Sequence, residues 1–168
     1  MASDIESKIW YDLVHAKNGD EYLCLYLVQQ ENIRKGFKIT TITLSVTGIV
    51  CGYKSVVVPM IVSFAIICLM QIATSIESFI IRSDDGMTRL RELRLLYYGR
   101  IIDIEKLFDA VRNGRISDED AASQFFALRE SAKKIEDLEN KVNVKTHRRL
   151  RSKARTSALN YLNTYYPS

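Results

Sequence analysis

The stretch ITTITLSVTGIVCGYKSVVVPMIVSFAIICLMQIATSIESFII, residues 39–81, decides the fold that the sequence predicts. Residues 39–53 are apolar or small, and residues 56–81 form a longer apolar run with one formal charge, Glu77. A helix needs about 20 predominantly apolar residues to cross the roughly 30 Å hydrocarbon core of a bilayer. The second run has this length, and the first is slightly short. We therefore expect two transmembrane helices joined by a tight turn at residues 52–55. The alternative is a helical hairpin buried in a soluble core.

Basic residues flank this stretch at both ends, whereas the turn inside it is nearly free of them. The turn between the two runs contains a single basic residue, Lys54. Three basic residues precede the first run and four follow the second, namely Arg34, Lys35, Lys38, Arg82, Arg89, Arg91 and Arg94. Because lysine and arginine concentrate in cytoplasmic loops, this asymmetry predicts that both termini lie in the cytoplasm and the turn lies outside.

The remainder of the chain is polar, so the mean hydropathy of the 168 residues is close to zero. This length leaves room for one small domain beside the hairpin. The three cysteines have neither metal-ligand nor CxxC spacing, which fits a reduced compartment without a disulfide framework. Residues 1–38 contain acidic side chains and no uninterrupted apolar core, so we expect no signal peptide.

Two helices are expected before the hairpin. Residues 4–17 place apolar side chains at helical spacing, namely Ile5, Ile9, Leu13 and Ala16, with Trp10 beside them. The sequence Asn-Gly-Asp at residues 18–20 is expected to end this helix and to start the next one. The second helix, over residues 21–37, leads into the first apolar run.

Two further helices are expected after a break at residues 83–86. A helix over residues 87–111 carries an apolar stripe that alternates steps of three and four, which is typical of a bundle or oligomerisation surface. Asn113-Gly114 ends it. Ser117 and Asp120 then resemble a capping box at the start of another helix that continues the stripe. The short connection predicts an antiparallel pair.

One more helix is expected near the C-terminal end, with its apolar end folded back onto the domain. The predicted fold class is therefore an all-α membrane protein, with a two-helix transmembrane hairpin and a cytosolic helical bundle formed by N-terminal and C-terminal helices. The predicted parts are N-terminal cytosolic or interfacial helices over residues 1–38, the hairpin over 39–82, and a cytosolic helical domain with a basic tail over 83–168.

No constellation of residues in the sequence indicates catalysis. His15 and His147 are the only histidines, and neither belongs to a nucleophile or metal-binding motif. The chain has no GxGxxG, P-loop or GxSxG motif. We therefore expect no enzymatic activity, no catalytic residues, no metal and no cofactor.

Small and polar residues form a stripe along each apolar run. Such stripes let helices approach closely, and polar groups in hydrocarbon seek partners. They either pack the hairpin internally or form a self-association face that lines a pore. Glu77 either pairs with Arg82 or forms a ring at the pore mouth. The candidate pore-lining or helix-packing residues are Thr41, Ser45, Gly48, Gly52, Ser63, Gln71, Thr74, Ser75, Glu77 and Ser78.

The C-terminal tail is strongly basic, with no acidic side chain after residue 140. This patch has three interpretations. It lies on anionic lipid headgroups, it binds nucleic acid or an acidic partner, or it is a solvated basic face. The candidate residues for binding phosphate or a partner are Lys145, Arg148, Arg149, Arg151, Lys153 and Arg155.

The order of these parts resembles the SLATT group of bacterial two-transmembrane effectors. An N-terminal helical segment with Ile9-Trp10-Tyr11 precedes the hairpin at residues 39–81, and a helical region rich in Leu, Tyr and Arg follows. The resemblance implies a toxic membrane effector of an antiphage system. It also implies control by a sensor in trans, such as a nucleotidyltransferase or a retron reverse transcriptase.

We therefore predict an effector that oligomerises and permeabilises the bacterial inner membrane when a partner sensor triggers it. Its partners would be the lipid bilayer, further copies of the chain and that sensor, with nucleic acid as a possible partner of the basic tail. The alternative is a membrane-anchored helical binding module that recruits a protein or nucleic-acid partner.

Overall fold

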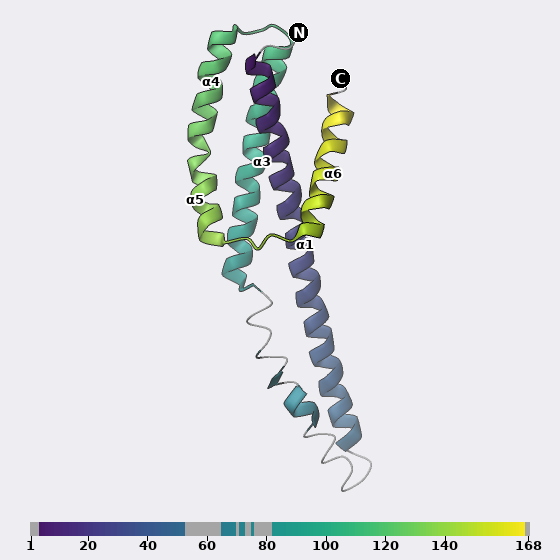
Figure 1. Ribbon diagram of the computed structural model, residues 1–168. Helices are drawn as coiled ribbons and strands as arrows, with labels where there is room; N and C mark the ends of the chain where they lie inside the picture. Colours follow the sequence, from purple (N-terminus) through teal and green to yellow (C-terminus); the bar gives the residue numbers. More distant parts are fainter. Residues whose placement is uncertain (1–3, 53–64, 70, 73–74, 76–81, 167–168) are drawn as a thin grey trace. The chain divides into compact units, whose positions relative to one another are not determined.

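The structure is a computed structural model that describes residues 4–52, 65–69, 71–72, 75 and 82–166, and the side chains of 44–52 lie outside that description. Every regular element of the described part is an α-helix, which confirms the prediction of an all-helical chain (Figure 1). The helices are α1 (Asp4–Gly52), α3 (Asp84–Arg112), α4 (Asp118–Ser131), α5 (Lys133–Val142) and α6 (Arg148–Tyr165). They belong to two compact units. Unit 1 comprises Met1–Leu27 and Thr88–Ser168, and unit 2 comprises Val28–Met87.

The predicted transmembrane hairpin is wrong for the part of the chain that the structure describes. Within that part, no helix combines the length and the apolar character needed to cross a membrane. The first predicted span, residues 39–53, coincides with the end of α1. Only about 14 residues of α1 follow Lys38, and at 1.5 Å per residue they cover about 21 Å, well below a bilayer core. The second predicted span, residues 56–81, lies outside the described residues except for 65–69, 71–72 and 75.

The predicted helix boundary at residues 18–20 is also wrong, because α1 continues through it without a break. Gly19 serves a different purpose. A Cβ atom on this residue would lie 2.6 Å from Cε1 of Tyr97, so only glycine allows the tyrosine ring to approach the helix this closely. The neighbouring Asp20 is buried and accepts a hydrogen bond from Nε of Arg94 at 3.1 Å. The Asn-Gly-Asp sequence is therefore a packing site between α1 and α3.

The core of unit 1 is built from the stripe that the sequence predicts on residues 87–111. The largest fully buried aliphatic side chains come from α1, α3 and α6, namely Ile9, Leu13, Leu90, Leu93, Ile104 and Leu162. Phe125 of α4 and Ile135 of α5 are buried as well. The stripe therefore packs against helices of the same chain, as in a bundle.

The helix ends follow local hydrogen bonding. Oγ of Ser83 accepts from the backbone N–H of Gly86 at 3.2 Å, so Ser83 is the N-cap of α3. The predicted break at residues 83–86 is therefore wrong for residues 84–86, which form the first turn of α3. Gly114 adopts a φ of +64° after α3, as expected for the residue that ends a helix. Oγ of Ser117 accepts from N–H of Asp120 at 3.1 Å, which confirms the predicted cap of α4.

In unit 1, the other helices lie on two sides of α1 and α3 (Figure 1). Helices α4 and α5 run back along α3, as the predicted antiparallel pairing requires, but they are two helices where the sequence predicted one. The hydroxyl of Tyr97 donates to Glu139 at 2.7 Å, and Nη1 of Arg100 donates to the carbonyl of Leu128 at 2.9 Å. Helix α6 runs antiparallel to the first part of α1, and this pairing positions the candidate site.

Candidate functional site

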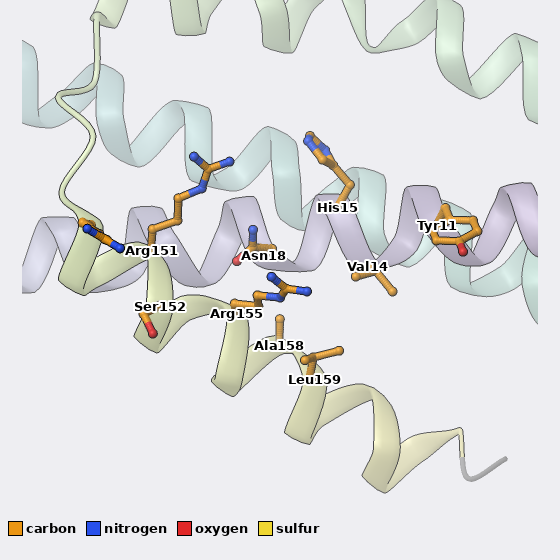
Figure 2. A pocket seen from close by; sticks show the side chains of 10 residues that line it. Tyr11, Val14, His15, Asn18, Arg151, Ser152, Arg155, Ala158 and Leu159 are labelled. Carbon is orange, nitrogen blue, oxygen red and sulfur yellow. The ribbon is translucent and has the colours of Figure 1, made fainter.

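A groove of about 590 Å³ lies between α1 and α6 on the surface of unit 1 (Figure 2). The side chains that line it recur at steps of three and four residues, so each helix presents one continuous face. We call this site the α1–α6 groove. Its lining residues are Tyr11, Val14, His15 and Asn18 from α1, and Arg148, Arg151, Ser152, Arg155, Ala158 and Leu159 from α6.

Contacts beside the groove hold α6 against α1. Ala154, Ala158 and Leu162 of α6 are buried, and these small or branched side chains let the two helices approach closely. Nζ of Lys17 lies 4.1 Å from the centroid of the Tyr161 ring, a favourable cation–π contact. This arrangement fixes the backbone of α6, and with it the positions from which its arginines project.

The connection that leads into α6 is also tied to α1. The hydroxyl of Tyr22 donates to the carbonyl of Lys145 at 2.7 Å and accepts from the backbone N–H of His147 at 3.0 Å. The imidazole of His147 stacks on the ring of Tyr26, with 6.0 Å between centroids. The first turn of α6, which carries Arg148, is therefore anchored directly.

The other end of α6 is held by aromatic packing. The rings of Trp10 and Tyr166 are 6.2 Å apart in an edge arrangement, and each ring also contacts Phe108 of α3. The hydroxyl of Tyr161 donates to Glu105 of α3 at 3.1 Å. Desolvation, and then the hydrogen bond with Glu105, raise the pKa of Tyr161 to about 12, so its hydroxyl keeps its proton at neutral pH.

The electrostatics of the groove are one-sided. No carboxylate lines it, and within the described residues the guanidinium groups of Arg148, Arg151 and Arg155 form no ion pair. The carboxylates of α1 nearby are engaged elsewhere. Asp12 pairs with Arg100 at 2.7 Å, and Glu21 pairs with Lys17 at 3.2 Å. Three positive charges therefore face the groove without compensation from this part of the chain.

One polar atom in the groove wall lacks a partner. Oδ1 of Asn18 is buried, and it has no hydrogen bond within the described part of the chain. Leaving a buried polar atom unsatisfied costs about 1–3 kcal/mol. In Figure 2, Asn18 lies between the side chains of Arg151 and Arg155. A donor on a bound molecule would satisfy this atom.

The structure divides the predicted basic residues into two sets. Arg148, Arg151 and Arg155 share the groove face of α6. Arg149 and Lys153 are exposed on α6 but do not line the groove, and Lys145 lies in the connection before α6. The six residues therefore do not form a single patch.

Sequence reasoning missed the contribution of α1. Tyr11, Val14, His15 and Asn18 follow the spacing of one helical face, and this signal is visible in the sequence. Their partner helix, however, lies more than 130 residues further along the chain. No local pattern could have paired them with it.

The residues predicted to line a pore are only partly described. Thr41 lies in α1 and donates to the carbonyl of Phe37 at 3.0 Å. Ser75 donates to the carbonyl of Gln71 at 2.9 Å, and both residues are exposed. Ser45, Gly48 and Gly52 lie within α1, but their side-chain surroundings are outside the description. The remaining candidates lie outside the described residues, namely Ser63, Thr74, Glu77 and Ser78.

These features define a helical-bundle protein with a basic surface groove. In the described part of the chain, no cluster of three or more histidine, cysteine or acidic residues could hold a metal ion. No protein-family model, curated protein or solved structure matches the chain. The resemblance to the SLATT group therefore stays a prediction, and the groove itself is the basis for a functional proposal.

Proposed function

We propose that this protein is a helical binding module that recognises a phosphate-bearing ligand through the α1–α6 groove. The observation that carries the proposal is that three arginines, Arg148, Arg151 and Arg155, line one groove that no carboxylate lines. Guanidinium groups bind phosphate oxygens through paired hydrogen bonds, and such charge-assisted bonds are stronger than neutral ones.

The arrangement supports this function over a merely solvated basic face. Arg149 and Lys153, four residues apart, share a different and solvent-exposed face of α6. The three groove arginines instead share the face of α6 that lines the groove, across from the face of α1 that carries His15 and Asn18, and a phosphate placed between the helices could contact groups from both helices. We propose binding rather than catalysis, because the groove contains no carboxylate or activated nucleophile.

The membrane-effector function that the resemblance implies depends on the predicted transmembrane hairpin. It requires a conduit built from a transmembrane hairpin, and the described helices do not support that hairpin. The binding-module interpretation requires only the groove. It therefore becomes the leading proposal.

The test is an isothermal calorimetric titration of the purified protein with inorganic pyrophosphate. The groove variant replaces Arg148, Arg151 and Arg155 with glutamine. The matched control replaces Lys145, Arg149 and Lys153 with glutamine, which removes the same charge outside the groove. We expect the groove variant to lose at least about tenfold in affinity, since each charge-assisted hydrogen bond contributes about 1.5–3 kcal/mol. The control should lose much less. Equal losses in both variants would show that the attraction is unspecific, and an absence of binding to the parent would refute the proposal.

A further inference from the structure

The α1–α6 groove has two chemically different ends. Helices α1 and α6 run antiparallel, so Asn18 lies at the end near Arg151, while Tyr11 lies at the end near Leu159 (Figure 2). Along α6, the distance from Arg148 to Leu159 is about 16 Å at 1.5 Å per residue. The groove therefore changes from basic to apolar over a length similar to that of a small organic molecule.

The apolar end leaves large side chains in contact with water. Tyr11 is 75% exposed and Leu159 is 39% exposed, whereas Ala158, next to Leu159 in the sequence, is buried. Val14 is half-buried on the opposite wall. A ring or a hydrocarbon chain placed here would cover the tyrosine face and the leucine, and both would gain from leaving water.

Asn18 provides a hydrogen-bond acceptor in the wall of the groove. This acceptor, Oδ1, needs a hydrogen-bond donor that the described residues do not supply. Buried polar atoms in native proteins are nearly always paired with protein, water or ligand. A hydroxyl or amino group next to the phosphate of a ligand would supply such a donor.

We infer that the ligand of this groove is a small organic phosphate, with its phosphate on Arg148, Arg151 and Arg155 and an aromatic or aliphatic body against Tyr11 and Leu159. The inference rests on the proposed phosphate-binding function and adds the second half of the ligand. The volume of about 590 Å³ lies within the range of small-molecule sites, roughly 300–1,000 Å³.

A nucleic-acid strand fits this groove less well than a small molecule does. A polymer presents phosphates at regular intervals, and those beyond the arginine end would lie on Tyr11 and Leu159 or leave the groove. The basic side chains outside the groove, Arg149 and Lys153, do not extend the arginine face toward that end. The groove therefore suits one anionic head with one apolar body.

The experiment compares three ligands that share the same diphosphate head, namely inorganic pyrophosphate, adenosine diphosphate and geranyl diphosphate. Calorimetry with the full chain gives the dissociation constant of each. We expect at least one of the two larger ligands to bind about tenfold more tightly than pyrophosphate, the gain expected when roughly 60 Å² of apolar surface leaves water. A preference for the adenosine compound indicates an aromatic body, and a preference for the geranyl compound indicates an aliphatic one.

The variant for this test replaces Tyr11 and Leu159 with serine, and the matched control replaces the exposed Tyr98 of α3 with serine. In the variant that lacks Tyr11 and Leu159, the ratio of the affinities for the preferred ligand and for pyrophosphate should fall toward one. The Tyr98 control should keep the ratio of the parent protein. Circular dichroism verifies that both variants are folded.

Several results would overturn the inference. Equal affinity of the parent for all three diphosphates would remove the apolar half of the ligand and leave the phosphate-binding function intact. Tighter binding of a short single-stranded oligonucleotide than of any diphosphate would identify a polymer instead. Failure of every ligand to bind would remove both the inference and the function on which it rests.

Discussion

Unit 1 and unit 2 use apolar residues in opposite ways. Unit 1 comes from the more polar part of the sequence, yet it contains a core whose largest aliphatic side chains are fully buried, Ile104 among them. Unit 2 contains the most apolar stretch of the chain, yet five of its described isoleucines and leucines are more than half exposed. They are Ile39, Ile42, Ile67, Leu69 and Ile72.

This difference shows that hydropathy alone does not decide burial. A core needs apolar side chains at a spacing that lets several helices bury the same stripe together. The α3 stripe meets this condition because α1, α4, α5 and α6 all pack around it. The run after Lys38 is rich in apolar residues, but the described part of unit 2 provides no comparable set of helices to pack around it.

The largest expected effect separates the two units directly. Replacing Ile104 with alanine should lower the free energy of unfolding of unit 1 by about 2–5 kcal/mol, because it leaves a cavity in the core. Replacing the exposed Ile42 with alanine should change stability by no more than about 0.5 kcal/mol. Denaturant unfolding followed by circular dichroism and by fluorescence of Trp10, the only tryptophan, measures both changes. Equal destabilisation by the two variants would contradict the difference in packing between Ile104 and Ile42.

A smaller effect should appear at two glycines of α1. Gly19→Ala should destabilise unit 1 by about 1–3 kcal/mol, since the new Cβ would press on the Tyr97 ring. Gly36→Ala in unit 2 should instead stabilise the helix by about 0.5–1 kcal/mol, because nothing lies within 4 Å of a Cβ there. Thermal unfolding of the two variants should therefore shift in opposite directions. An increase in the unfolding temperature of both variants would show that the Tyr97 ring leaves room for a Cβ atom on residue 19.

The smallest effect is confined to alkaline pH. Burial, and then hydrogen bonding to Glu139, hold the pKa of Tyr97 well above its ordinary value, and burial likewise raises the pKa of Tyr166. Burial raises the pKa of Tyr161 to about 12. Since the folded state holds these protons more tightly than the unfolded chain does, the stability they contribute is complete below about pH 10 and is lost as the pH rises toward 12.

The variant Tyr161→Phe isolates this contribution. At neutral pH it should be less stable than the parent, because the hydrogen bond to Glu105 is lost. The difference between the two proteins should shrink as the pH rises from 10 to 12. Unfolding midpoints measured across this range provide the test, and a constant difference would contradict the raised pKa of Tyr161.

The sequence predicted the features of this fold that depend on local chemistry. The cap at Ser117 and the stop at Gly114 follow from preferences of single residues within one turn. The α3 stripe follows from helical periodicity. Gly19 was misread because the same residue type serves as a helix end and as a site of close packing, and only the position of Tyr97 distinguishes the two uses.

The site was predictable to a smaller extent. The charge of the tail identified α6, and helical spacing separates Arg148, Arg151 and Arg155 from Arg149 and Lys153. The groove itself depends on a tertiary contact with α1, which no periodicity reports. The hairpin prediction failed for a related reason, because it counted apolar residues over 39–81 without knowing which helices contain them.

The pairing of α1 with α6 also has a consequence for how the protein is made. A ribosome releases α1 long before α6, so the face that carries Asn18 emerges with no opposite wall. The groove can close only after the residues up to Leu159 have left the exit tunnel, and closing it requires contacts of very long sequence separation, which form late. A nascent chain stalled at Asn143 would hold every α1 residue of the site and yet have no affinity for phosphate. Under the proposed function, ligand binding therefore marks a chain whose synthesis has passed α6.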